Sequence, residues 1–220
     1  GLELQTKLKD KYELILANRS ILDITEYSKT FDFINIKKPD IIINCAAYTA
    51  VDLCEQNEIE AYKSNAIGPK NLAMAAKEAD AKLVHISTDY VFDGEGVKDE
   101  CGNNRPYYET DVTNPQSAYG RTKLEGEKFV TEKTNKYFII RTAWLYGDGN
   151  NFVRTMINLS KTKNEIRVVD DQIGSPTSTS ELANMIEKLI ETEEYGIYHG
   201  TCEGFCSWYD LTCKIYKQLK

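Results

Sequence analysis

The stretch IIINCA, residues 41–46, is β-branched and apolar on both faces. Strands with this composition are buried on both sides, as in the centre of a parallel sheet that helices cover on each face. Working outward, KLVHIS (82–87) and YFIIRT (137–142) have a similar character, and helical patterns separate the three. Strands that alternate with helices indicate βαβ units. We therefore predict an α/β fold with a Rossmann-type doubly wound parallel sheet.

Helices and shorter strands are predicted around these three strands. Asn114-Pro115 offers an N-cap and a first helical residue for a helix over 115–133. Gly68-Pro69 should kink or break a long helical tract over 51–79. The other predicted helices cover 2–8 (beginning at or before residue 1), 26–37, 151–162, 179–192 and 207–219, and the other predicted strands are 12–17, 165–169 and 196–199.

The order of these elements suggests two parts. Residues 1–145 are expected to form a dinucleotide-binding domain that includes the 115–133 helix. Residues 146–220 are expected to be mainly a smaller carboxyl-terminal substrate-binding lobe, partly interleaved with the first part. A doubly wound domain ordinarily opens with a strand and a glycine-rich turn, so we expect the first strand and the far carboxyl terminus of the fold to be missing from this chain.

Composition excludes several classes of protein. The net charge is −7 over 220 residues and no basic stripe is visible, which argues against nucleic-acid binding. No apolar run is long enough for a membrane span, and the first residues are not a signal peptide. The six cysteines are scattered, which favours reduced thiols in a cytoplasmic enzyme. Cys202-x-x-x-Cys206 has the wrong spacing for a common zinc module, so we predict no metal site.

Tyr119 and Lys123 are spaced so that both side chains share one helix face. A cation near a phenol favours the phenolate and lowers the phenol pKa, and a general acid works best with a pKa near the operating pH. The same spacing recurs at Tyr216 and Lys220, on a plain amphipathic helix, where we interpret it as structural. Only context can select the first pair as catalytic.

Residues at the ends of the predicted strands provide that context. Thr88 and Asp89 directly follow the 82–87 strand, and the carboxyl ends of parallel strands line the ligand crevice of open α/β sheets. The Thr88 hydroxyl could hydrogen-bond a substrate carbonyl beside Tyr119; the alternative is a turn or an N-cap. The small residues in Cys45–Thr49 could let a flat ligand approach the backbone, or could serve tight helix–strand packing.

Two positions near the amino terminus bear on a cofactor. Gly1 fits the last glycine of a dinucleotide fingerprint, although one glycine at the head of a helix is weak support. Arg19 follows the predicted 12–17 strand, where an arginine can accept a ribose 2′-phosphate and so favour NADPH over NADH. A solvated surface arginine is the alternative.

Several strings taken together resemble the dTDP-4-dehydrorhamnose reductase family of extended short-chain dehydrogenases/reductases, which act in nucleotide-sugar biosynthesis. The resemblance runs through essentially the whole chain. The strings that carry it are LDIT (22–25), INCAAYTAVD (43–52), STDYVFDG (87–94), NPQSAYGRTKLEGE (114–127) and RTAWLYG (141–147).

The resemblance implies that NADPH or NADH delivers hydride to the C4 keto group of dTDP-4-dehydro-6-deoxy-L-sugar, giving dTDP-L-rhamnose. It implies that Tyr119 protonates the alkoxide, that Lys123 lowers the tyrosine pKa and holds the nicotinamide ribose, and that Thr88 binds near the reacting carbonyl. A homodimer is a further expectation, because family members often pair. The other implied contacts are Asp89 and Trp144 with the sugar; Asp23 and Ile24 with the adenine side; Ala46, Ala47, Tyr48 and Thr49 beneath the cofactor; and Asn65, which orders the site.

Two other functions stay open at this point. One is a non-catalytic, dinucleotide-binding regulatory subunit resembling the beta subunit of methionine adenosyltransferase. The intact set of Thr88, Tyr119, Lys123 and Trp144 disfavours it, because a binding-only subunit has no need for a tuned proton donor. The other is a reductase, 4-epimerase or dehydratase of a different nucleotide sugar. A dehydratase usually adds an Asp-Glu pair beside the threonine, and here Asp89-Tyr90 follows instead.

Overall fold

Four parallel strands form the main sheet in the order β1-β2-β5-β9. The structure is a computed structural model that describes residues 1–219. The strands are β1 (Ile41–Asn44), β2 (Lys82–Thr88), β5 (Tyr137–Thr142) and β9 (Gly196–His199). Each register places the carboxyl ends of neighbouring strands at one edge, so residues that follow β1 and β2 meet there. The predicted parallel α/β fold is confirmed.

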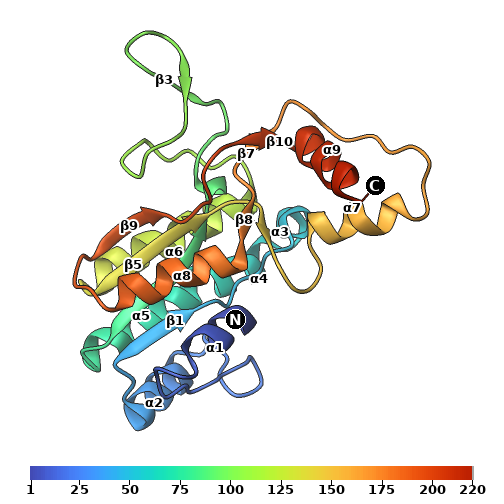
Figure 1. The fold of residues 1–220 in the computed structure, drawn as a ribbon. Helices are drawn as coiled ribbons and strands as arrows, with labels where there is room; N and C mark the ends of the chain where they lie inside the picture. Colours follow the sequence, from blue (N-terminus) through green and yellow to red (C-terminus); the bar gives the residue numbers. More distant parts are fainter. Residues whose placement is uncertain (220) are drawn as a thin grey trace.

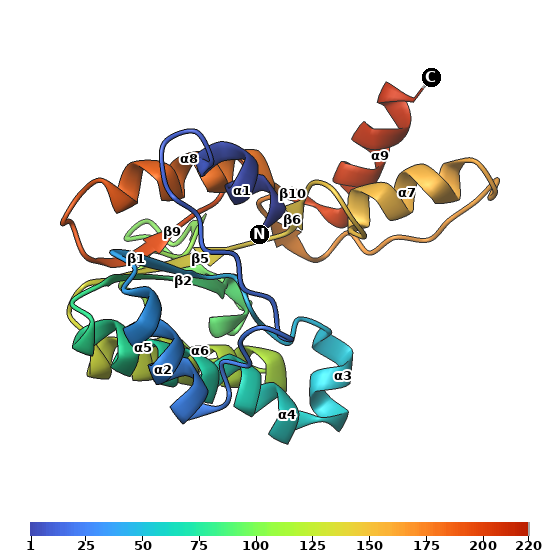
Figure 2. The ribbon, with the colours of Figure 1, turned by 90° about the horizontal axis from the view of Figure 1, so that it is seen from below.

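Helices cover both faces of this sheet (Figures 1 and 2). On one face, α2 (Tyr27–Lys37), α5 (Gly68–Glu78) and α6 (Ala118–Lys133) enclose a core that contains Ile34, Leu72 and Val130. On the other, α1 (Leu2–Leu8) and α8 (Thr179–Ile190) pack over Val84, Phe138 and Ile140. Both faces are covered by helices, so the buried polar residues of these strands, among them Asn44, His85 and Arg141, stand out as candidates for function.

The remaining elements are short. Figure 1 shows a hairpin, β3 and β4, that projects from the body, and a pair of helices, α7 and α9, set to one side of the sheet. Two small ladders, parallel β6–β8 and antiparallel β7–β10, lie beside α7 and α9. The bounds are α3 (Val51–Gln56), α4 (Glu58–Tyr62), η1 (Lys63–Ile67), η2 (Asp89–Val91), β3 (Val97–Lys98), β4 (Asn104–Arg105), β6 (Leu145–Tyr146), α7 (Phe152–Ser160), β7 (Ile173–Gly174), β8 (Thr177–Ser178), β10 (Cys206–Ser207) and α9 (Trp208–Gln218).

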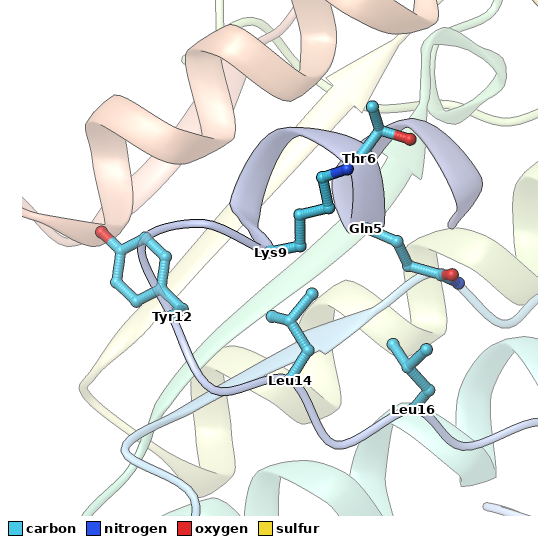
Figure 3. A pocket seen from close by; sticks show the side chains of 6 residues that line it. All are labelled: Gln5, Thr6, Lys9, Tyr12, Leu14 and Leu16. Carbon is cyan, nitrogen blue, oxygen red and sulfur yellow. The ribbon is translucent and has the colours of Figure 1, made fainter.

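Two predicted strands are wrong. The 12–17 segment is extended, and Tyr12 and Leu14 pack into the core beside α1, but no strand is hydrogen-bonded to it. Figure 3 shows this segment beside α1. Side chains from both line an open pocket of about 400 Å³. The 165–169 segment makes one backbone bond, from the Tyr209 amide to the Val169 carbonyl, which is too little for a ladder. An apolar pattern supplies the buried face of a strand, whereas its hydrogen-bonding neighbour depends on tertiary placement.

Two predicted helices are also corrected. The 51–79 tract is broken at Asn57, and the π-helix η1 precedes Gly68-Pro69, where α5 begins. Helix α6 begins at Ala118 rather than at 115, because Ser117 is its N-cap and accepts a hydrogen bond from the Gly120 amide at 3.1 Å. The Asn114 amide group points instead at Asp93. Lys220, of the Tyr216/Lys220 pair, lies outside the described residues.

A glycine allows α6 to pack against η1 at backbone distance. A Cβ on Gly126 would lie 2.1 Å from the Asn65 carbonyl oxygen, so Gly126→Ala must push α6 away from η1. We expect an overpacking cost near 3 kcal/mol, partly offset by the roughly 1 kcal/mol better helix propensity of alanine, hence a net loss of about 2 kcal/mol. Urea denaturation would measure it. Glu132→Ala, exposed on the same helix, is the control and should change stability by less than about 0.5 kcal/mol. A Gly126→Ala protein as stable as the parent would contradict this packing.

Within residues 1–219, none of the helices is both long and apolar enough to cross a bilayer. The same part of the chain has six free cysteines and no group of three metal-ligating side chains placed to hold an ion.

Candidate active site

Thr88 and Asp89 stand where β2 ends. The Thr88 hydroxyl donates to the Asp89 carboxylate at 3.0 Å and accepts from the Tyr90 amide at 3.2 Å, so it caps the short helix η2. The N-cap interpretation of Thr88 is confirmed, and this N-cap lies at the carboxyl edge of the sheet. Thr88 is buried and Asp89 is partly buried, and burial raises the pKa of the Asp89 carboxyl.

Tyr119 is held in place by the start of α6. The amide of Ala118 donates to the Glu55 carboxylate at 2.7 Å, and Ser117 caps the first turn. Gly120 lies so close to η2 that a Cβ there would fall 2.2 Å from the Tyr90 carbonyl oxygen. The Tyr119 ring meets the Tyr90 ring edge-on, with centroids 5.5 Å apart. The α6 start and η2 are thus locked together, which brings Tyr119 to Thr88.

The Tyr119 phenol is kept protonated. Burial raises its pKa to about 12, and the nearby Asp89 carboxylate adds to the rise, while a hydrogen bond with the Thr88 hydroxyl opposes it. A phenol with this pKa still transfers its proton readily to an alkoxide, which is a stronger base than a phenolate. Tyr119 is therefore arranged as a proton donor.

The Lys123 side chain turns toward β2. Its ammonium donates to the Ile86 carbonyl at 2.6 Å and lies 3.4 Å from Nε2 of His85, and its side chain is buried. Burial lowers the pKa of Lys123 to about 8, against opposing effects of Glu127 and Cys45. The expected lowering of the Tyr119 pKa by Lys123 is corrected here, because the lysine turns toward β2 and burial dominates the phenol.

Asn65 orders the loop after β1. Its amide oxygen accepts from the Tyr48 amide at 2.8 Å, and its amide nitrogen donates to the Tyr48 carbonyl at 3.1 Å and to the Thr122 hydroxyl at 3.1 Å. Asn65 is fully buried, and both ends of its amide are engaged by the protein. It therefore positions the 46–49 backbone and is not itself available to a ligand. Cys45 and Ala46 stay exposed at the end of β1.

A second group of predicted residues lies between α1 and α2. Arg19 is exposed and pairs with Asp23 at 3.3 Å. Asp23 also accepts from the amide and hydroxyl of Thr25, which lowers the pKa of the Asp23 carboxyl. Ile24 packs on Gly68. Gly1 is the N-cap of α1 and lies beside the carboxyl end of β1 in both ribbon views (Figures 1 and 2).

Trp144 has a strained backbone and a rigid ring. Its φ of +46° is uncommon for a bulky side chain. The ring stacks on Trp208 with centroids 3.4 Å apart, and it lies so close to Gly174 that a Cβ there would fall 2.4 Å from Cε2 of the Trp144 ring. Strain of this kind persists only where packing holds it and often marks a ligand site.

Sequence reasoning missed two groups beside these residues. His85 of β2 is fully buried and contacts Lys123. The buried ion pair between Arg141 of β5 and Glu127 of α6 was not predicted. The signal was available in part, since Lys123 and Glu127 share one helix face with spacing i, i+4.

Comparison with known proteins agrees with this geometry. The family model for the RmlD substrate binding domain matches residues 1–220. The chain belongs to the RmlD family. The spore coat polysaccharide biosynthesis protein SpsK of Bacillus subtilis is 42% identical to this RmlD-family chain over 220 residues, covering 99% of the chain and 75% of SpsK.

Solved structures of the RmlD family are similar throughout. A dTDP-4-dehydrorhamnose reductase from Clostridium acetobutylicum is 55% identical, with a TM-score of 0.95 over 100% of this chain and 76% of that one. A dTDP-4-dehydrorhamnose reductase from Bacillus anthracis in complex with NADP is 47% identical, with a TM-score of 0.93 over 100% of this chain and 76% of that one. The resemblance inferred from the sequence is confirmed.

Proposed function

We propose that this RmlD-family chain is an NAD(P)H-dependent reductase that converts the C4 keto group of dTDP-4-dehydro-6-deoxy-L-sugar to the alcohol, giving dTDP-L-rhamnose. The observation that carries the proposal is the joining of Thr88, Asp89 and a protonated Tyr119 at the carboxyl edge of the sheet. A protonated phenol beside a hydroxyl suits a reaction that ends by protonating an alkoxide. The identity of 55% with a dTDP-4-dehydrorhamnose reductase supports the choice of sugar.

The residues at this edge fit a dinucleotide. Cys45 and Ala46 are small and exposed, and Asn65 fixes the backbone of Tyr48 beside them, so a flat ligand can lie against this edge without displacing a side chain. The Bacillus anthracis relative was solved with NADP. The residues that would hold the cofactor here are Gly1, Arg19, Asp23, Ile24, Ala46, Ala47, Tyr48, Thr49, Tyr119 and Lys123, with Asn65 acting through Tyr48.

The proton chemistry follows from the side chains. When bound, the reduced nicotinamide supplies hydride to the carbonyl carbon. Tyr119 gives its phenolic proton to the carbonyl oxygen, so that the C=O bond becomes a CH–OH group and a phenolate remains. Thr88 orients that oxygen, Lys123 in its charged form holds the nicotinamide ribose, and Asp89 and Trp144 bind the sugar. The phenolate recovers a proton from solvent after the product leaves.

The test is oxidation of NADPH or NADH by the protein, followed by absorbance, with dTDP-4-dehydro-6-deoxy-L-sugar generated in situ. Loss of the reduced-nicotinamide absorbance together with formation of dTDP-L-rhamnose is the expected result. Dinucleotide binding without turnover would instead support a regulatory subunit resembling methionine adenosyltransferase beta. Turnover with a different nucleotide sugar would keep the chemistry and change the substrate.

Arg19 is proposed to recognise the 2′-phosphate of NADPH. Its guanidinium is exposed and its partner Asp23 is held from the other side by Thr25, so Arg19 can turn to a phosphate at little cost. Charge-assisted hydrogen bonds contribute about 1.5–3 kcal/mol, so Arg19→Ala should raise KM for NADPH by about tenfold or more and leave KM for NADH nearly unchanged. Lys188→Ala, exposed on α8, is the matched control for loss of one positive charge. Equal effects of Arg19→Ala on both cofactors would refute this role.

The division of labour along the chain is also proposed. Residues 1–145 supply most of the dinucleotide site. Residues 146–220 supply mainly substrate contacts: Trp208 stacks on Trp144, which lies just before the boundary, and β9 returns to the main sheet. A cytoplasmic location and a homodimer are part of the proposal. Analytical ultracentrifugation would test the dimer.

A further inference from the structure

Three buried polar side chains form a continuous chain across β1, β2 and α6. Asn44 lies opposite His85 in the parallel register, and its amide nitrogen is 3.1 Å from Nδ1 of His85. The other ring nitrogen, Nε2, is 3.4 Å from the amine of Lys123. All three are at most 4% exposed. Neither Asn44 nor His85 is used in the chemistry described above.

Two residues on β2 and two residues on α6 lie at nearly the same distance from each other along their elements. His85 and Ser87 are two residues apart on one face of β2, about 6.6 Å, and Lys123 and Glu127 are one turn apart on α6, about 6 Å. His85 therefore meets Lys123, while the Ser87 hydroxyl donates to Glu127 at 2.5 Å. The contact between His85 and Lys123 is thus built into the way α6 packs on β2.

The backbone decides which way the Asn44 amide points. The Ala46 amide donates to the Asn44 oxygen at 3.0 Å, and a backbone N–H can only donate. The Asn44 nitrogen, also a donor, must then face His85, so Nδ1 of His85 has to be the acceptor. A neutral imidazole with an unprotonated Nδ1 carries its hydrogen on Nε2. A doubly protonated ring would set two donors against each other, and burial lowers the pKa of His85 well below its ordinary value.

This tautomer has a consequence for Lys123. The Nε2–H of His85 is a donor aimed at the lysine nitrogen, and an ammonium has no lone pair with which to accept. The neutral amine can accept it while still donating to the Ile86 carbonyl at 2.6 Å. The other titratable groups that act on Lys123 are Glu127 of α6 and Cys45 after β1, and Arg141 of β5 is paired with Glu127.

We propose that Asn44 and His85 are positioning residues for the reduction: Asn44 locks His85 as the Nε2–H tautomer, and His85 thereby biases Lys123 toward its uncharged form. The negative charge of Glu127 favours the charged form of Lys123, whereas burial and the His85 hydrogen bond favour the neutral form. The balance lets Lys123 change its charge within the pH range in which the enzyme works. The protonation of Lys123 on α6 therefore depends on which way the Asn44 amide of β1 is turned. The kinetic part of the inference rests on the proposed function; the tautomer does not.

The tautomer is tested first, on the free protein. Long-range proton–nitrogen NMR of the imidazole should show Nε2 protonated and Nδ1 unprotonated between pH 6 and pH 9, a range of about three units around neutrality. A protonated Nδ1 would overturn the inference whatever the enzyme does. This readout needs no substrate, so it separates failure of the inference from failure of the proposed function.

Asn44→Asp reverses the hydrogen bond. A carboxylate there can still accept from the Ala46 amide, but it accepts from Nδ1–H of His85, which turns Nε2 into an acceptor for the lysine ammonium. The Lys123 side-chain titration, followed by carbon NMR at Cε, should move up by about one pH unit or more. Because the charged lysine is the form that holds the nicotinamide ribose, the fall of kcat at alkaline pH should move up by the same amount. One pH unit above the parent midpoint, the variant should then keep about five times as much of its maximal kcat as the parent does.

The control is Asn103→Asp, which adds the same charge on the β3–β4 hairpin (Figure 1). It should leave both titrations in place. His85→Gln, which has no fixed tautomer and can either donate or accept, should give a Lys123 midpoint between those of the parent and Asn44→Asp. Unchanged Lys123 titrations in folded Asn44→Asp and His85→Gln proteins would overturn the proposal. Circular dichroism would establish folding independently of activity.

Discussion

Tyr119→Phe is expected to lower kcat by about 10²–10⁴-fold while leaving dinucleotide binding nearly unchanged. The substitution removes the proton that the carbonyl oxygen must receive and leaves the ring in place. The Tyr119 phenol is the protonated group at the crevice edge, because burial raises its pKa to about 12. Since KM reports binding and kcat reports the chemical step, the loss should fall on kcat. Steady-state kinetics with the nucleotide-sugar ketone, alongside fluorescence titration of NADPH, would measure both.

Tyr90→Phe is the matched control. The Tyr90 ring touches Tyr119 edge-on at 5.5 Å, yet its side chain is 43% exposed and is not assigned a part in the chemistry. It should retain most of the activity. If Tyr119→Phe kept substantial turnover, or if Tyr90→Phe lost as much, the assignment of the proton donor would be wrong.

The main sheet was predictable because the composition of its strands indicates that helices cover them on both faces. Ile41–Asn44 and Tyr137–Thr142 are apolar on both faces, and burial under helices on both sides is what such a pattern requires. The 12–17 segment is also largely apolar, and its Tyr12 and Leu14 pack into the core beneath α1 and α8, but no strand is hydrogen-bonded to it. Pairing is a property of two segments, so the pattern of one segment does not determine it.

The start of α6 shows a competition that local rules do not resolve. Asn114-Pro115 and Ser117 are both good helix starts. The structure uses Ser117, because Asn114 is occupied by Asp93 and by the Val91 carbonyl, and Glu55 from α3 receives the Ala118 amide. Tertiary partners far away in the sequence thus set the register of the helix that carries Tyr119.

The sequence predicted which residues form the candidate site better than it predicted what their side chains contact. Spacing placed Tyr119 and Lys123 on one helix face, and strand ends placed Thr88 beside them, as the structure has it. Spacing does not say where a long side chain turns, and Lys123 turns to Ile86 and His85. That direction depends on the buried His85 of β2, and only the packing of α6 on β2 brings His85 and Lys123 together.

The buried pair of Arg141 and Glu127 is expected to have the largest effect on stability. The Arg141 guanidinium makes bonds of 2.7–3.2 Å to both carboxylate oxygens, and the two side chains are at most 5% exposed. Glu127→Gln keeps the shape and removes the charge, which leaves a buried guanidinium without a counter-ion. Breaking a buried pair from one side costs about 3–5 kcal/mol. Guanidinium chloride or urea denaturation of the variant should show a loss of that size.

Two comparisons decide whether burial is the cause. Glu125→Gln breaks the exposed pair with Lys128 on the same helix and should cost less than about 1 kcal/mol. The double substitution Glu127→Leu with Arg141→Met removes both charges and fills the space, so it should be clearly more stable than Glu127→Gln alone, because no charge is left unpaired. If the double variant were instead as unstable as the sum of its single substitutions, the loss would come from packing and from the Ser87 and Glu109 hydrogen bonds. The ion pair would then stabilise the fold on balance, rather than mattering only when one of its two charges is left unpaired.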